Sequence, residues 1–227
     1  MTFTGPFDEQ PFPDKLQGHV VAPDADPRIH GYATQSDLAR SVPFLDIGWL
    51  ALTGNLPTDG ERRPLGIALA WLAPLHVGEG PTHAIVLARI AGGPDHVLPG
   101  VAGLALGQLA AHEIETAGHV GRWLDGSGEL PAASIATAPA AVAAYQDLAR
   151  DSAAWFAVPL PPSPALTRVA AAYALLHRLG ITDSLRLQAF SAWARLPAVM
   201  AEAAYARPGA VRAYPARLPD YQYTEEP

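Results

Sequence analysis

The residue best placed to do chemistry is an arginine inside an apolar segment. Arg195 stands among Phe190, Trp193 and Leu196, where a charged side chain is costly unless it is paired. A guanidinium pairs best with a carboxylate, which it can hold through two parallel hydrogen bonds. The sequence therefore predicts that Arg195 binds either the carboxylate of a small acid or an acidic side chain of its own chain, and both alternatives stay open.

Three further polar residues, His112, Glu115 and His119, recur at i, i+3 and i+7 and so share one side of a helix. Helical metal sites use such spacing, and His112 with Glu115 could instead supply acid/base groups. The same spacing arises often by chance where a long helix becomes polar. We interpret the three residues as a solvent-facing polar face. A metal site of His112, Glu115 and His119 is the alternative, and no other metal site is expected.

Composition excludes several classes of function. The chain has 227 residues and no cysteine, which removes disulfides, thiolate catalysis and zinc-thiolate or iron–sulfur sites. Its net charge is −7 with only 15 basic residues, so it lacks the clustered Lys and Arg that bind phosphate backbones. We expect no nucleic-acid partner. The N-terminus lacks a basic start followed by an apolar core, and no apolar run is long enough to span a bilayer, which predicts a cytoplasmic protein without a membrane partner.

The elements that must position these residues are predicted to be helices, because alanine is abundant and β-branched residues are sparse. Residues 1–28 contain five prolines and little periodicity, which predicts an extended arm or a short hairpin around Val20 and Val21. Thr34 or Ser36 could cap a short turn that carries Leu38. Pro43 starts an apolar helix that stops at Gly54, and the turn 55–58 launches another helix. Short apolar helices follow over 65–75 and 82–91.

One long helix is predicted from Leu98 to about Trp123, apolar on nearly all sides in its first half and therefore central. After a break at 125–128, an Ala-rich helix reaches toward Phe156, and the four prolines of 158–164 exclude a helix there. The last two predicted helices run from 166 to Gly180 and from Ser184 to Tyr205, the second interrupted by Pro197. Residues 211–227 form a tail rich in Pro and Tyr.

Three segments carry a resemblance to a known family. The run from Ile29 to Thr58, with its Leu56-Pro57-Thr58 turn, is similar to the entry helices of the citrate synthase and citryl-CoA lyase family. Leu75-His76, followed by Pro81-Thr82-His83 and Arg89, resembles the segment in which that family places a substrate-binding histidine. The run from Phe190 to Pro197 resembles the penultimate helix, which carries an arginine for a substrate carboxylate.

The resemblance implies an all-α fold: a citrate-synthase-like large helical domain over 29–210, with the small domain much reduced to a remnant at about 120–165. It also implies a homodimer, or a heterodimer with a related chain. His76 would bind a substrate carbonyl or take part in catalysis, and Arg195 would bind the acid, whereas a loop-capping role for His76 is the alternative. Arg212 and Arg217 in the tail resemble an arginine that reaches the neighbouring subunit's site, against the alternative of solvated surface.

The chain departs from the family pattern at the reacting groups. Where the family has an enolate-stabilising histidine, Leu109-Ala110-Ala111 leads to His112 and Glu113. Where the family has an aspartate base, the chain has the stretch 163–167, Ser-Pro-Ala-Leu-Thr. His112 is the candidate replacement catalytic group near the lost histidine.

Two functions remain open. The first is an enzyme of the acyl-CoA-dependent citrate synthase type or the citryl-CoA lyase type, which forms or cleaves a carbon–carbon bond between a coenzyme A thioester and a 2-oxo or hydroxy carboxylic acid. No bound cofactor is expected, because coenzyme A is a co-substrate. The second is a non-catalytic relative that binds a small carboxylic acid or serves as a dimerising partner subunit.

Overall fold

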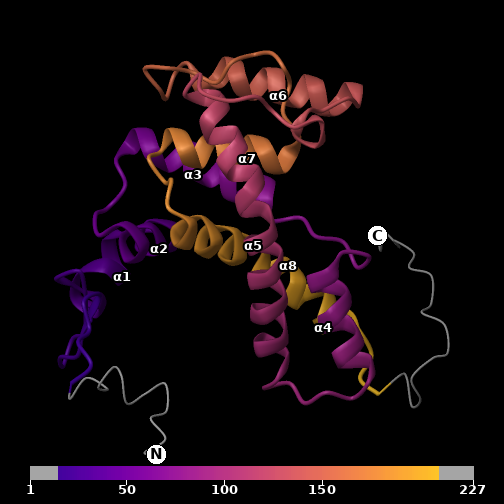
Figure 1. Ribbon diagram of the computed structural model, residues 1–227. Helices are drawn as coiled ribbons and strands as arrows, with labels where there is room; N and C mark the ends of the chain where they lie inside the picture. The colour runs from indigo at the N-terminus through magenta and orange to yellow at the C-terminus, as the bar shows by residue number, and fades with distance from the viewer. Residues whose placement is uncertain (1–14, 210–227) are drawn as a thin grey trace, which may run out of the picture. The chain divides into compact units, whose positions relative to one another are not determined.

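The computed structural model describes residues 15–209 and divides at Thr58 into two compact units, which we describe separately (Figure 1). The prediction of an all-α protein is confirmed, since short strands occur only in the first unit of the described chain. Within residues 15–209, no helix is both long enough and apolar enough to cross a bilayer.

The first unit opens with three two-residue strands, β1 (Val21–Ala22), β2 (Arg28–Ile29) and β3 (Tyr32–Ala33), paired antiparallel in that order. The turn between β2 and β3 has His30 at φ 46° and Gly31 at φ 88°, in the left-handed region that glycine enters without strain. The hairpin predicted near Val20 and Val21 is therefore present, with a third strand added.

A carboxylate begins the first helical turn of this unit. Asp26 accepts hydrogen bonds from the backbone N–H of Gln35 at 2.7 Å and from the backbone N–H and hydroxyl of Ser36 at 2.9 and 2.6 Å. These bonds, the one from the Ser36 hydroxyl first, lower the pKa of Asp26. The turn they start is a π-helix, η1 (Thr34–Leu38), followed by α1 (Ala39–Ser41). Thr34 and Ser36, which were predicted as caps, thus lie inside the turn. The capping side chain is that of Asp26, which precedes the turn in the sequence.

The helix α2 (Phe44–Thr53) matches its prediction at both ends. Pro43 is the N-cap residue, and its fixed φ leads the chain into the helix. Gly54 has φ 88°, and its N–H bonds to the carbonyl of Leu50 at 2.8 Å, which closes the last turn.

The second unit holds the long helices. They are α3 (Asp59–Leu72), α4 (Gly80–Ile90), α5 (Leu98–Leu124), the 3₁₀ turn η2 (Ala132–Ser134), α6 (Pro139–Ser152), α7 (Arg168–Arg178) and α8 (Ser184–Tyr205). Helix α5 packs against α4, α7 and α8, and is the central element of the unit (Figure 1). The prediction of one long central helix starting at Leu98 is confirmed.

Two packed regions lie on α5. Around its first half, apolar side chains of α4, α5 and α8 form one core cluster, which includes Ile85, Leu106 and Val199. Beside its second half runs α7, in which every residue from 170 to 176 is buried. Full burial on all sides means that α7 is held by α3, α5 and α6 together rather than by one amphipathic face.

The region expected as a small-domain remnant contains the end of α5, the turn η2 and the helix α6. Helix α6 is followed by an irregular stretch, and no residue of 158–164 is helical, as the prolines predicted. The Tyr145 hydroxyl donates to the carbonyl of Pro161 at 2.8 Å, and the Ser152 hydroxyl accepts from the N–H of Leu160 at 2.8 Å. These two hydrogen bonds hold residues 160 and 161 of the irregular stretch against α6.

Two predicted interruptions are absent. Helix α3 begins at Asp59, directly after the turn 55–58 that was predicted to launch a helix, and it continues without a break to Leu72, so the helix predicted to start at 65 is part of it. Helix α8 continues through Pro197, which was predicted to interrupt it. Burial of Phe190, Arg195 and Val199 along one side of α8 holds the helix together across the proline.

Replacing Ser152 by Ala should destabilise the second unit. The Ser152 side chain is fully buried, and its loss leaves the Leu160 N–H without its acceptor, which costs about 1–3 kcal/mol. Chemical denaturation monitored by circular dichroism measures the change. Ser163→Ala, at an exposed serine of the same stretch, is the matched control and should change stability by less than about 0.5 kcal/mol. Equal effects of the two variants would contradict the prediction.

Candidate functional site

Helix α8 places Arg195 on its buried side. Asp183 caps the helix by accepting from the N–H of Arg186 at 2.9 Å. From that start, Leu187, Ser191 and Arg195 recur every four residues and are all buried. The Arg195 side chain is only 1% exposed, so its charge depends on partners within the protein.

The partner of Arg195 is an acidic side chain of the same chain. Glu113 on α5 receives Arg195 through two hydrogen bonds, Nη1 to Oε2 and Nη2 to Oε1, each 2.7 Å long. Arg195 also donates from Nη1 to the Ser191 hydroxyl and from Nε to the carbonyl of Leu72 at 3.2 Å. Of the two alternatives that the sequence left open, the internal ion pair is the one present in this structure.

Glu113 is itself held by further donors. The Tyr173 hydroxyl on α7 donates to Oε2 at 2.7 Å, and the Ser191 hydroxyl lies 3.4 Å from the same oxygen. Burial, followed by the negative charge of Glu113, raises the pKa of the Tyr173 hydroxyl, which therefore stays protonated and donating. Side chains of α5, α7 and α8 and the last carbonyl of α3 thus meet in one network, which we call the Arg195 network.

Sequence reasoning did not select Glu113 or Tyr173 for this network. The two charged partners are separated by 82 residues, so no local spacing connects them. The available signal was the buried arginine itself, which required a carboxylate somewhere in the chain or in a ligand.

A second arginine lies beside the network. Arg168, the first residue of α7, donates to the carbonyl of Trp71 and, at 3.0 Å, to that of Pro74. These carbonyls end α3 and begin the loop that leads to His76. Burial and then the nearby charge of Arg195 lower the pKa of Arg168. Arg168 was not selected from the sequence, because a helix-starting arginine carries no signal for a contact so far away in the chain.

His76 occupies an exposed loop. Its ring Nδ1 accepts from the backbone N–H of Gly78 at 3.1 Å, and the backbone N–H of His76 donates to a carboxylate oxygen of Glu79 at 2.7 Å. Its side chain is 59% exposed, with Nε2 3.9 Å from the same carboxylate. This is the geometry of a loop-capping histidine. Since Arg195 bonds to Leu72 and Arg168 to Pro74, His76 follows the segment that both arginines hold.

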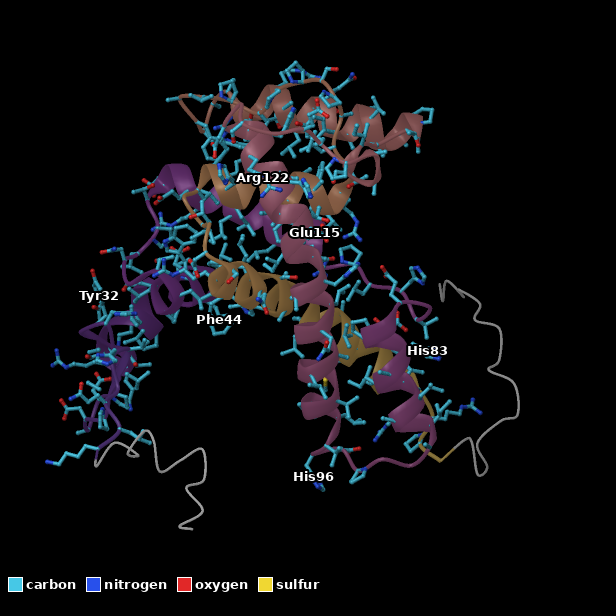
Figure 2. The ribbon with its side chains drawn as sticks, in the orientation of Figure 1. Tyr32, Phe44, His83, His96, Glu115 and Arg122 are labelled. Atoms are coloured by element: carbon cyan, nitrogen blue, oxygen red, sulfur yellow. The ribbon has the colours of Figure 1, made fainter. Side chains whose placement is uncertain are left out.

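His112, Glu115 and His119 are not gathered around one point in the described part of the chain. Across residues 15–209, no three His, Cys, Asp or Glu side chains come together as ligands for an ion. Glu115 and His119 instead make a loose pair, with Oε1 and Nε2 3.8 Å apart, and Nδ1 of His119 lies 3.1 Å from Nη2 of Arg122. Glu115 and Arg122 both project from α5 (Figure 2). His112 is exposed on α5. Arg212 and Arg217 lie outside the described residues.

Removing Glu113 should destabilise the protein strongly. Glu113→Ala leaves Arg195 buried without a counter-charge, and breaking a buried ion pair in this way costs about 3–5 kcal/mol. Urea denaturation measures the loss. Glu115→Ala, two residues along α5 at an exposed position, is the control and should have little effect. A loss below about 1 kcal/mol for Glu113→Ala would mean that the pair does not hold the unit together.

No protein-family model and no curated protein matches the sequence. Among solved structures, the chain is similar to citryl-CoA lyase from Hydrogenobacter thermophilus, with a TM-score of 0.62 and 16% sequence identity. The similarity covers 93% of this chain and 95% of the lyase chain. At this identity the likeness concerns the fold, and the fold of this chain is therefore the all-α, citrate-synthase-like one.

Proposed function

We propose that this chain is a non-catalytic citrate-synthase-like protein whose helical scaffold serves as a dimerising partner. The observation that carries the proposal is the bidentate ion pair between Arg195 and Glu113. Arg195 is the residue that the family resemblance assigns to a substrate carboxylate. A guanidinium offers five N–H donors, and here Glu113, Ser191 and the Leu72 carbonyl receive four hydrogen bonds from it.

The internal carboxylate has a concentration advantage over a dissolved one. Glu113 is fixed within hydrogen-bond distance of Arg195 and needs no loss of translational freedom to bind it. An acid from solution would have to displace the carboxylate of Glu113, which also accepts a hydrogen bond from the Tyr173 hydroxyl. His76, the other residue assigned to substrate, uses its Nδ1 within its own loop. Arg195 and His76, the two residues of the predicted acid site, thus both make hydrogen bonds within the protein.

The dimerising role is supported by the surface of α4 and α5. From Leu98 to Ala111, α5 contains no charged residue. A largely apolar groove of about 570 Å³ lies between α4 and α5, lined by Pro81, Ala84 and Leu104 among others. Leu104 is 71% exposed, and contiguous apolar surface of this kind is characteristic of interaction sites. We propose that a second copy of the chain covers it.

A lyase is the second candidate. The alignment with citryl-CoA lyase covers 95% of that enzyme, so a chain of this extent is compatible with catalysis. In this case coenzyme A thioesters would be substrates, and His112 or another group would supply acid/base chemistry. Incubation with citryl-CoA, or with acyl-CoAs and 2-oxo acids, separates the candidates. Under the first proposal neither free thiol nor a cleavage product forms above the buffer rate, and turnover would overturn it.

A carboxylic acid added in solution should bind to Arg195 only when Glu113 has been replaced. In Glu113→Ala, citrate or a smaller carboxylate can pair with the vacated guanidinium and raise the melting temperature. At ten times its dissociation constant a ligand contributes about 1.4 kcal/mol, or roughly 3–6 °C for a domain of this size. Thermal denaturation with increasing citrate measures the effect.

The control for this experiment is Glu115→Ala with the same citrate concentrations, because citrate also stabilises proteins by exclusion from their surface. The unmodified protein and Glu115→Ala should show the same small rise, which is the surface effect alone. A larger, saturable rise in the unmodified protein would contradict the proposal that Glu113 closes the site.

Leu104→Glu should convert a dimer into monomers. The substitution places a charge on the uncharged face of α5, and burying it in an interface without a partner costs several kcal/mol. Sedimentation velocity measures the state of assembly. Leu185→Glu, at a leucine that is 77% exposed on α8, is the matched control and should remain dimeric. A monomeric unmodified protein at micromolar concentration would refute the homodimer.

A further inference from the structure

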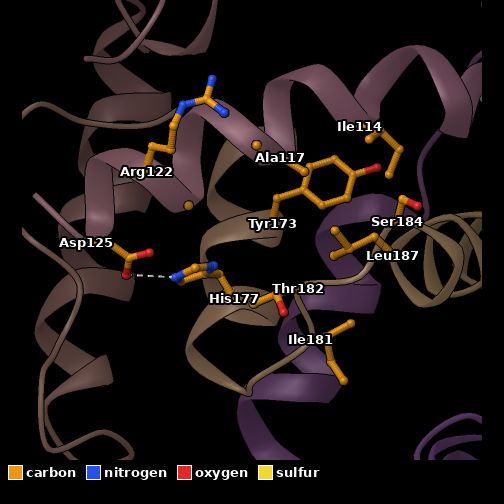
Figure 3. Close-up of a pocket in the computed structure, with 12 residues that line it drawn as sticks. Ile114, Ala117, Arg122, Asp125, Tyr173, His177, Ile181, Thr182, Ser184 and Leu187 are labelled. Carbon is orange, nitrogen blue, oxygen red and sulfur yellow. Dashed lines mark hydrogen bonds and ion pairs between the residues drawn. The ribbon is translucent and has the colours of Figure 1, made fainter. Parts of the chain in front are cut away.

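A cavity of about 250 Å³ lies between the second half of α5, the C-terminal half of α7 and the start of α8 (Figure 3). It shares Tyr173 with the Arg195 network, but its other polar groups belong to different residues. Neither the family resemblance nor the proposed function uses this cavity.

Most of the cavity wall is apolar. Ile114 and Ala117 contribute from α5, and Ile181 and Leu187 from the chain around the start of α8 (Figure 3). Gly118 leaves part of the space open, because a Cβ built there would meet only the Nη1 end of Arg122, at 3.5 Å. A mainly apolar hollow with a few polar groups is the usual form of a small-molecule site.

A histidine and an aspartate form one polar side of the cavity. Nε2 of His177 lies 3.1 Å from Oδ1 of Asp125, and the two side chains face each other (Figure 3). The imidazole lies close to α5 at Gly121, where a Cβ would be 3.0 Å from its Nδ1. Glycine at 121 therefore lets the ring sit beside the helix, and Asp125 fixes its direction.

Arg122 provides the remaining charge. Its guanidinium contacts Nδ1 of His119 at 3.1 Å, and no acidic side chain among residues 15–209 forms an ion pair with it. Thr182 and Ser184 add two hydroxyls that make no hydrogen bond within the same part of the chain. Asp125 and His177 hydrogen-bond to each other, so Arg122 is the charged group lining the cavity that has no acidic partner among residues 15–209.

We propose that this cavity binds a small monocarboxylic acid with a short apolar body. The carboxylate pairs with Arg122, the geometry in which a guanidinium binds most strongly, and the apolar body lies against Ile114 and Leu187. Asp125 disfavours a second carboxylate on the same ligand. The volume lies below the roughly 300–1,000 Å³ typical of sites for drug-sized ligands, which suits a small acid.

The test uses hexanoate, with hexanol and hexylamine as probes of the same length, followed by isothermal titration calorimetry at fixed salt. Hexanoate should bind at least about tenfold more tightly than hexanol, the ratio that about 1.4 kcal/mol of charge-assisted bonding gives. Hexylamine should bind most weakly. Equal affinities for the three probes, or no binding of hexanoate, would overturn the proposal.

Two variants locate the site. Arg122→Gln should reduce hexanoate affinity to that of hexanol, whereas Arg150→Gln, at an exposed arginine of α6, should leave it unchanged. Gly118→Leu fills the cavity, and because leucine favours a helix over glycine, the variant should stay folded. Hexanoate binding should then be lost. Unchanged binding in Gly118→Leu, or equal weakening in Arg122→Gln and Arg150→Gln, would place the ligand elsewhere and refute the assignment. The outcome is independent of whether Glu113 closes the Arg195 site.

Discussion

A buried guanidinium is the constraint on which the second unit depends. Because Arg195 is buried, its charge requires an opposite charge and its N–H groups require acceptors. A buried unpaired charge and a buried N–H without an acceptor each destabilise the folded state. Glu113 supplies the charge, and Ser191 and the end of α3 supply the other acceptors. These groups come from three helices, and Tyr173 adds a fourth. The network therefore fixes the relative register of the helices, whereas apolar packing alone would tolerate small slips.

Much of the fold was predictable because its signals are local. Pro43 and Gly54 bound α2 as capping rules require, and the apolar run from Leu98 predicted the central helix. The continuity of α8 was not predicted, because burial along one side of the helix overrode what Pro197 indicates locally. The continuity of α3 from Asp59 to Leu72 was not predicted either, since its exposed polar start lacks the apolar spacing that marks the rest of the helix. The hidden cap at Asp26 was missed for a similar reason, since it acts from ten residues away.

The site was predictable only in part. Arg195 could be singled out because a charge in an apolar segment must be neutralised, and the sequence correctly reduced its partner to two classes. It could not choose between them, since Glu113 becomes a neighbour only after α5 and α8 have packed. In this fold, similar to that of a known enzyme, the buried guanidinium is paired by a carboxylate of its own chain.

Helix α3 is far in sequence from the helices that cover it, and this affects how the chain folds during its synthesis. Arg168 of α7 bonds to α3 across 97 residues of chain, and α8 lies later still. At about 5–20 residues per second, α3 is synthesised on the order of 5–20 s before α7. During that interval its buried side chains, Leu65, Ala68 and Leu72, have no native cover. The nascent chain is therefore a natural client for a chaperone that shields apolar helices, although the finished protein buries this face completely.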